Sequence, residues 1–293
     1  ASNVFVGYGA GATTNTALEC TVVGHGAMRT VTGSYNTAIG KGVLGDGTGG
    51  GASNTGVGSR ALQGISSGDW NTAVGSNALQ TASTHGYNTA VGKSAGNKID
   101  TSYNTLVGSI AGEKLAGGSG HNTIVGFAAG RGDSDNFSGS YNVFMGSYAM
   151  GDNSLGSSSS NIIIGYRAGY EALTVNNNVV IGHQAMYTDE TGDSNVYIGY
   201  EAGYGMAGES YNVGIGQKAL YTDGPGNATA IGYNAMTTAT GDNCTAVGQY
   251  ANKTGTGDKT VAIGVSAGNA WAGAVSSVAI GYNAAYYNTG NYN

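Results

Sequence analysis

A single short repeat runs through this 293-residue chain and limits what the chain can fold into. Each repeat has a glycine, here called the anchor glycine, and we number the other positions of the repeat relative to it. Position −1 is Val, Ile or Met, position +3 is Ala in sixteen of seventeen repeats, and position −4 is Asn in twelve. A period this regular indicates a repeat architecture. The anchor glycines lie 16 to 20 residues apart, at Gly7, Gly24, Gly40, Gly58, Gly75, Gly92, Gly108, Gly126, Gly146, Gly165, Gly182, Gly199, Gly216, Gly232, Gly248, Gly264 and Gly281.

Each repeat is too short for two helices, and its apolar residues lie two positions apart, which is the period of a β-strand. A second stretch, such as Ala78-Leu79, predicts a second short strand, and the linkers are rich in the turn formers Gly, Ser, Asp, Asn and Thr. The sequence therefore predicts an all-β fold, a parallel β-solenoid (β-roll) of about 17 short coils. We expect one continuous domain over residues 1–293, about 80 Å long at the usual strand spacing.

Composition excludes several other classes. The 55 glycines lack the three-residue period of collagen. The net charge is −6 and the eleven Lys and Arg residues form no stripe, so we expect no nucleic-acid partner. No run of about 18 apolar residues occurs, so we expect no membrane contact in this segment. The abrupt ends, "ASNVFVG" and "YNTGNYN", predict that the chain is a segment of a longer fibre.

The residues around the anchor glycine suggest which face is buried. We expect positions −3 and −1 to face the inside of the coil and position −2 to face outward. Position −2 is nevertheless apolar in nearly every repeat, and strands that are apolar on both faces are buried on both faces. This pattern predicts an elongated parallel homotrimer in which neighbouring chains cover position −2. The predicted interface includes Phe5, Ala90, Leu106, Phe144, Ile163, Ala246 and Ala279, and the predicted structural glycines include Gly75, Gly92, Gly165, Gly199 and Gly281.

Two known kinds of repeat resemble this one. The strings "SSVAIG" (276–281) and "KTVAIG" (259–264) resemble the head repeats of trimeric autotransporter adhesins, and "NTAVGSNAL" (71–79) resembles repeats of bacteriophage tail fibres. The repeats here are longer than those of the adhesin heads. The resemblance implies parallel β-rolls assembled as trimers, and an extracellular location on a cell surface or a virion.

Residues that could carry chemistry are scattered. Sixteen of the seventeen acidic residues fall in linkers or at their edges, and His25 and His183 lie nine coils apart. No catalytic or phosphate-binding motif occurs, so we expect no enzyme activity and no cofactor. Cys20 and Cys244 share position −4 but are on the order of 60 Å apart, too far for a disulfide within one chain. They either replace Asn as small residues or form a disulfide between chains.

Position −3 leaves a second function class open. It is Thr in seven consecutive coils, and flat threonine arrays are how some solenoids bind ice. The same position is Val or Ile in later coils, which favours an inward-facing core residue. The Asn residues at −4 are interpreted as a structural stack that closes the corner of each coil.

Aromatic residues form two ranks, a rank being the residues at one repeat position in successive coils. They could stack against sugar rings or pack against each other between coils. Of the aromatic residues 20 are Tyr and only 4 are Phe, so most carry a polar group. One rank follows the anchor glycine directly (Tyr8, Phe127, Tyr166, Tyr200, Tyr233 and Tyr282), and the other stands at −5 (Tyr35, Trp70, Tyr87, Tyr103, Tyr141 and Tyr211).

The longest linkers flank Gly146, and loops on a rigid scaffold are where binding usually occurs. The linker "GRGDSDNFSGS" (130–140) contains the tripeptide that integrins recognise, and its acids with Asn136 could instead hold calcium or be ordinary loop acids. We expect receptor contacts within residues 130–160, with Arg131, Asp133, Asp135, Phe137 and Tyr148 as candidates, and Asp133 and Asp135 as weak metal candidates. The favoured function is an attachment fibre that binds a host or surface receptor, either a glycan or a protein. The alternatives are a purely structural filament segment and an ice-binding or enzymatic solenoid.

Overall fold

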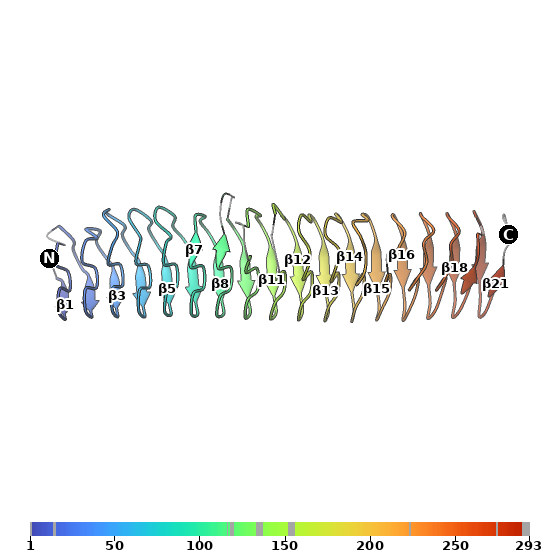
Figure 1. Ribbon diagram of the computed structural model, residues 1–293, viewed down its shortest axis with the longest axis horizontal. Helices are drawn as coiled ribbons and strands as arrows, with labels where there is room; N and C mark the ends of the chain where they lie inside the picture. The colour runs from blue at the N-terminus through green and yellow to red at the C-terminus, as the bar shows by residue number, and fades with distance from the viewer. Residues whose placement is uncertain are drawn as a thin grey trace. The chain divides into compact units, whose positions relative to one another are not determined.

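A computed structural model describes residues 2–13, 16–115, 117, 120–132, 137–151, 156–222, 224–273 and 275–288. The chain divides into two compact units, the first formed by residues 1–148 and 153–157 and the second by residues 149–152 and 158–293. All regular secondary structure in the described residues is β-strand. Each unit is a stack of parallel β-coils (Figure 1), which confirms the predicted all-β solenoid. The single continuous domain stays a prediction.

In the first unit, nine three-residue strands form a parallel sheet, and two shorter strands pair separately. The sheet strands are β1 (Val4–Val6), β2 (Thr21–Val23), β3 (Thr37–Ile39), β4 (Thr55–Val57), β5 (Thr72–Val74), β6 (Thr89–Val91), β8 (Thr105–Val107), β10 (Thr123–Val125) and β11 (Val143–Met145). The separate pair is β7 (Lys98–Ile99) and β9 (Lys114–Leu115).

The second unit has the same construction with eight sheet strands. These are β12 (Ile162–Ile164), β13 (Val179–Ile181), β14 (Val196–Ile198), β15 (Val213–Ile215), β16 (Thr229–Ile231), β17 (Thr245–Val247), β18 (Val261–Ile263) and β20 (Val278–Ile280). The separate pair is β19 (Ala270–Trp271) and β21 (Tyr287–Asn288).

Within each unit, the sheet strands of successive coils pair in register, so equivalent repeat positions lie side by side. Thr72 pairs with Thr89 and Val74 with Val91 in the first unit, and Ala246 pairs with Ala262 in the second. Each rank therefore runs along its unit at the strand spacing, about 4.8 Å.

The stretch that follows the anchor glycine is not the second strand that the sequence predicted. It is a chain of turns in which positions +2 and +4 both have left-handed backbone, as at Asn77 (φ 58°) and Leu79 (φ 47°). Because left- and right-handed residues alternate here, N–H groups point alternately to the two neighbouring coils. The N–H of Asn77 donates to Ser59 in the preceding coil, and the N–H of Leu79 donates to Ala95 in the following one.

The anchor glycines have φ between 123° and 148°, where side chains are rarely tolerated. Their neighbours add a second restriction. A Cβ on Gly75 would collide with the carbonyl of Gly92, and a Cβ on Gly165 or Gly199 would collide with the carbonyl of the next anchor glycine in the same way. Gly92 has the same conformation and crowding, and Gly281 shares the conformation at the end of the second unit.

The structure reverses the predicted orientation of the strands. Position −2 faces the inside of its own coil, and positions −3 and −1 face outward. Six of the residues predicted to form the trimer interface are buried within the single chain: Ala90, Leu106, Phe144, Ile163, Ala246 and Ala279. The seventh, Phe5, is partly exposed and lies in the first strand. Both faces are apolar, so hydrophobicity alone could not distinguish them.

Core packing explains which residues occupy position −2. The side chain at −2 meets the residue at +4 of the same coil, and their sizes are usually complementary. Large residues at −2 accompany glycine at +4 in the pairs Leu106–Gly112, Ile124–Gly130, Ile163–Gly169 and Tyr197–Gly203. Small residues at −2 accompany Leu or Met at +4 in the pairs Ala38–Leu44, Gly56–Leu62, Ala73–Leu79, Gly214–Leu220 and Ala230–Met236.

The buried Asn residues at −4 form a hydrogen-bonded column at the entrance to the sheet. The N–H of Asn71 donates to Oδ1 of Asn54 (2.9 Å), and the N–H of Asn88 donates to Oδ1 of Asn71 (3.0 Å). The amide of Asn71 also donates to the backbone carbonyl of His85 (2.9 Å). In these coils the buried amides are thus satisfied from coil to coil, as the structural interpretation of this position expected.

Candidate functional site

The outward face of the sheet is a strip two side chains wide and without charge in both units. Its −1 rank is Val, Ile or Met throughout, and its −3 rank is Thr, Val or Ile. Val74 is 38% exposed and Ile263 is 39% exposed, and many other −1 residues are similar. Monomeric proteins rarely expose contiguous apolar patches beyond a few hundred Å². The strip is therefore a candidate for contact with another surface.

The threonines at −3 lie on this strip, contrary to the prediction that they face the core. Thr21, Thr37, Thr55, Thr72, Thr89, Thr105 and Thr123 are all exposed or half-exposed. They carry hydroxyl and methyl groups at the coil spacing beside an aliphatic rank. Because these threonines face outward, an inward orientation no longer excludes ice binding.

The aromatic rank at −5 packs between coils in part of the first unit. Four rings stack in order, with centroid distances of 5.0 Å for Tyr87–Tyr103, 4.8 Å for Tyr103–His121 and 5.1 Å for His121–Tyr141. The planes of these neighbours differ by 4° to 10°. Cross-coil packing therefore accounts for these four residues, although their outer edges remain in solvent.

Nearer the start of the same rank, the stack is interrupted. Position −5 is Tyr35, then Ser53, then Trp70 in three successive coils. These three residues line an open cleft of about 490 Å³. A second cleft, of about 260 Å³, lies beside the intact stack and is lined by His85, Asp100, Thr101, Ser102, Tyr103, Gly120 and His121.

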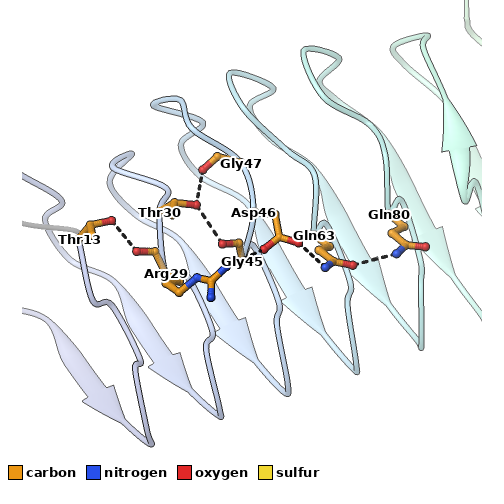
Figure 2. A network of polar contacts seen from close by, with 8 residues as sticks. All are labelled: Thr13, Arg29, Thr30, Gly45, Asp46, Gly47, Gln63 and Gln80. Atoms are coloured by element: carbon orange, nitrogen blue, oxygen red, sulfur yellow. Dashed lines mark hydrogen bonds and ion pairs between the residues drawn. The ribbon is translucent and has the colours of Figure 1, made fainter.

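A further rank, near position +5, was not recognised in the sequence. In the first unit it is polar and links successive coils (Figure 2): Arg29 pairs with Asp46 (3.2 Å), Gln63 donates to Asp46, and Gln80 donates to Gln63 (2.8 Å). Thr13 and Thr30 add hydrogen bonds to backbone carbonyls of neighbouring coils.

In the second unit, position +5 carries a stack of tyrosines instead. Tyr170, Tyr187, Tyr204 and Tyr221 have successive ring centroids 5.3, 5.0 and 5.2 Å apart. Arg167 lies over the Tyr170 ring and Lys218 over the Tyr221 ring. This stack could have been predicted from the sequence, because these tyrosines recur at intervals of 17 residues.

The predicted receptor-binding residues do not form one described surface. Phe137 is 1% exposed and packs against Phe144 in the coil interior, so its side chain is not available to a receptor. Tyr148 is half-buried and meets the Phe127 ring edge-on, and Arg131 lies 3.8 Å from the carboxylate of Glu113. Asp133 and Asp135 lie outside the described residues, so of the integrin-type tripeptide only Arg131 and Gly132 are described.

The structure brings together few groups suited to metal binding or catalysis. Within the described residues, no three His, Cys, Asp or Glu side chains are grouped as a metal site would require. His25 stacks on Tyr8, and His183 lies between Tyr166 and Tyr200. Cys20 and Cys244 are both buried free thiols at position −4. The N–H of Cys20 donates to Oδ1 of Asn3 (2.8 Å), so Cys20 continues the backbone hydrogen bonding of the Asn column.

One carboxyl group lies in the interior of the second unit. Asp189 is fully buried, and its Oδ1 accepts N–H groups of Gly192 (2.9 Å) and Gly208 (3.1 Å). Burial raises the pKa of Asp189 from an ordinary 3.8 to about 6, and the charge of Glu209 adds to this shift. From the sequence we expected Asp189 to be a solvated linker acid, because nothing in the residues of its linker indicates that the linker folds back over the core.

No protein-family model matches the chain, and no curated protein matches it. Among the described residues, the structure contains no helix with the length and apolar character needed to cross a lipid bilayer.

Proposed function

We propose that this chain is part of an attachment fibre that assembles as a parallel homotrimer through the outward strip of its sheets. The uncharged −3 and −1 ranks carry the proposal, because they leave apolar side chains of each single chain in solvent. The interface differs from the one that the sequence suggested: Val74 and Ile263 belong to it, and the buried Ala246 does not. The fibre carries no enzymatic activity and needs no cofactor.

The form of the strip supports a small closed assembly. A strip that is only two side chains wide is too narrow for a broad sheet-on-sheet interface, but it suits three chains that meet around one axis. Closed rotational symmetry is the usual arrangement of homo-oligomers. A parallel arrangement places every coil against its own counterpart, so threonine-rich coils meet threonine-rich coils and aliphatic coils meet aliphatic ones. This assembly fits an extracellular fibre on a cell surface or virion, in line with the resemblance of the repeats.

Sedimentation equilibrium of the purified chain tests this proposal. We expect the mass of a trimer for the wild type and a large shift toward monomer when Val74→Glu and Ile263→Glu are combined, because each places three charges around the axis. The matched control is Ser76→Glu, an exposed site two residues from Val74. A monomeric wild type, or a trimer unaffected by the double substitution, would overturn the homotrimer.

The outward threonines favour ice binding as a second candidate. The seven consecutive threonines form a regular hydroxyl and methyl array in the first unit. Measurement of thermal hysteresis and of ice recrystallisation decides this candidate, with Thr72→Lys and Thr89→Lys as variants. Activity that these substitutions remove would put ice binding ahead of the fibre, and no activity in the wild type would eliminate it.

A further inference from the structure

The interruption of the −5 rank has a defined geometry. The N–H of Ser53 donates to Ser34 (3.0 Å) and the N–H of Trp70 donates to Ala52 (3.1 Å), so the three coils keep the same backbone register as the intact stack. The backbone at position −5 is also the same, with φ of 62° at Tyr35, 57° at Ser53 and 61° at Trp70. Only the middle aromatic side chain is replaced, by a serine.

The missing ring leaves an opening that is one ring deep. Neighbouring rings of the intact stack lie 4.8 to 5.1 Å apart, and Tyr35 and Trp70 are separated by two coils, or about 10 Å. The two side chains are 57% and 59% exposed, so the cleft between them opens to solvent. The Ser53 hydroxyl lies at the position that a ring would otherwise occupy.

We propose that this cleft binds one pyranose ring of a neutral hexose, held between Tyr35 and Trp70 with Ser53 below it. A chair-shaped sugar carries hydrogens on both faces and is thicker than a flat ring, so it suits an opening of about 10 Å better than a nucleobase does. Aromatic rings with a polar edge bind molecules that have both apolar and polar surfaces. The Tyr35 hydroxyl, the Trp70 indole N–H and the Ser53 hydroxyl supply hydrogen bonds to sugar hydroxyls.

A neutral ligand is favoured because none of the described residues that line the cleft is charged. A carboxylate or sulfate between the two rings would lose water without gaining a partner. The cleft volume, about 490 Å³, is within the usual range for small-molecule sites and leaves room for a second sugar unit beside the first. In a trimer, three copies would bind a polysaccharide with avidity.

This inference deepens the proposed function and rests on it only for its biological role, since the cleft belongs to a single chain. The test is isothermal titration calorimetry of the full chain with hexasaccharides of β-linked glucose, β-linked galactose and β-linked mannose, and with adenosine. Trp70 fluorescence is an independent reporter, because Trp271, the other of the two tryptophans, is fully buried. We expect saturable binding of at least one hexasaccharide, with a change in Trp70 emission.

Three variants locate the site. Ser53→Tyr fills the missing ring and should lower the affinity at least tenfold without disturbing the fold, because tyrosine already occupies this backbone conformation at Tyr35 and Tyr87. Trp70→Ala should have the same effect, measured by calorimetry. Tyr141→Ala, at the end of the intact stack, is the matched control and should leave binding within twofold of the wild type.

The outcomes separate this site from the assembly. Absence of saturable binding to all three hexasaccharides overturns the site, as does equal binding by wild type and Ser53→Tyr, or binding of adenosine alone. Sedimentation of the same samples reports the assembly independently. Binding by a monomer would therefore support the site and overturn the trimer, and a trimer without binding would do the reverse.

Discussion

Gly203 lies against the ring of Tyr197, so close that a Cβ on Gly203 would stand 2.6 Å from Cγ of the ring. Tyr197 occupies position −2 and Gly203 position +4 of one coil. The next coil solves the same packing problem in the opposite way, with Gly214 at −2 and Leu220 at +4. In these two coils the combined volume is kept, although neither position is conserved.

An exchange of volume tests this relationship. Tyr197→Gly alone should lower the free energy of unfolding by about 3–5 kcal/mol, because it leaves a cavity. Gly203→Leu alone should cost at least about 1–3 kcal/mol through overpacking. The double variant reproduces the neighbouring coil, and we expect it to cost clearly less than the sum of the two. Additive losses in urea unfolding would show that the two positions do not share one space.

The anchor glycines should tolerate no side chain. Gly75→Ala forces a Cβ into the Gly92 carbonyl and requires an unfavourable φ, so we expect a loss of several kcal/mol of stability, or failure to fold. Gly42→Asn is the matched control. Gly42 has φ 64° and open space around it, and other coils place Asn at the same position. Thermal unfolding should show a large loss for Gly75→Ala and a change within about 0.5 kcal/mol for Gly42→Asn.

The Asn column should depend on amide chemistry rather than on size. Asn71→Asp keeps the shape and the acceptor for Asn88 but removes the donor to the His85 carbonyl and buries a charge. We expect a loss of about 3 kcal/mol or more near pH 7, measured by urea unfolding. Asn77→Asp, at a half-exposed position, is the control and should change little. Equal effects at the two sites would contradict a structural role for the column.

Asp189 should make the second unit less stable as the pH rises. Its pKa is higher in the folded chain, about 6, than its ordinary 3.8, so the folded state binds the proton more tightly. The stabilisation is present below about pH 4 and is lost as the pH rises through about 6. Between pH 4.5 and pH 7.5 we expect the wild type to lose about 2 kcal/mol relative to Asp189→Asn. Parallel pH profiles for the two proteins would mean that Asp189 does not titrate in this range.

Much of the fold could be predicted from the sequence because the repeat defines it. The anchor glycines set the coil, the spacing of apolar residues set the strand, and the Asn residues at −4 indicated a buried column. The predicted orientation of the strand was wrong because positions −2 and −1 are both apolar. The sequence did contain evidence that position −2 faces inward, namely the complementary sizes at −2 and +4, as in Ala73–Leu79. Sizes at two positions vary together when the two side chains share one space.

Other features depend on geometry that the residue types do not reveal. Leu79 and Asn77 are unremarkable in sequence, so the alternating left-handed turns that replace the second strand could not be read from them. The sequence contained part of the evidence for the cleft. Tyr35 and Trp70 belong to the −5 rank, which the sequence shows. The cleft forms because Ser53 interrupts this rank while the register of the coils keeps both rings in place.

The recurrence of the same turn after each anchor glycine has a consequence at the level of the gene. Removing residues 76–92 would join Gly75 to Lys93, and the turn after Gly75 would then be supplied by the following repeat. Every junction in the shortened chain would be one already present in the original. Insertion or deletion of the coding DNA for one repeat would therefore lengthen or shorten the protein by a whole coil while the structure of each remaining coil is preserved.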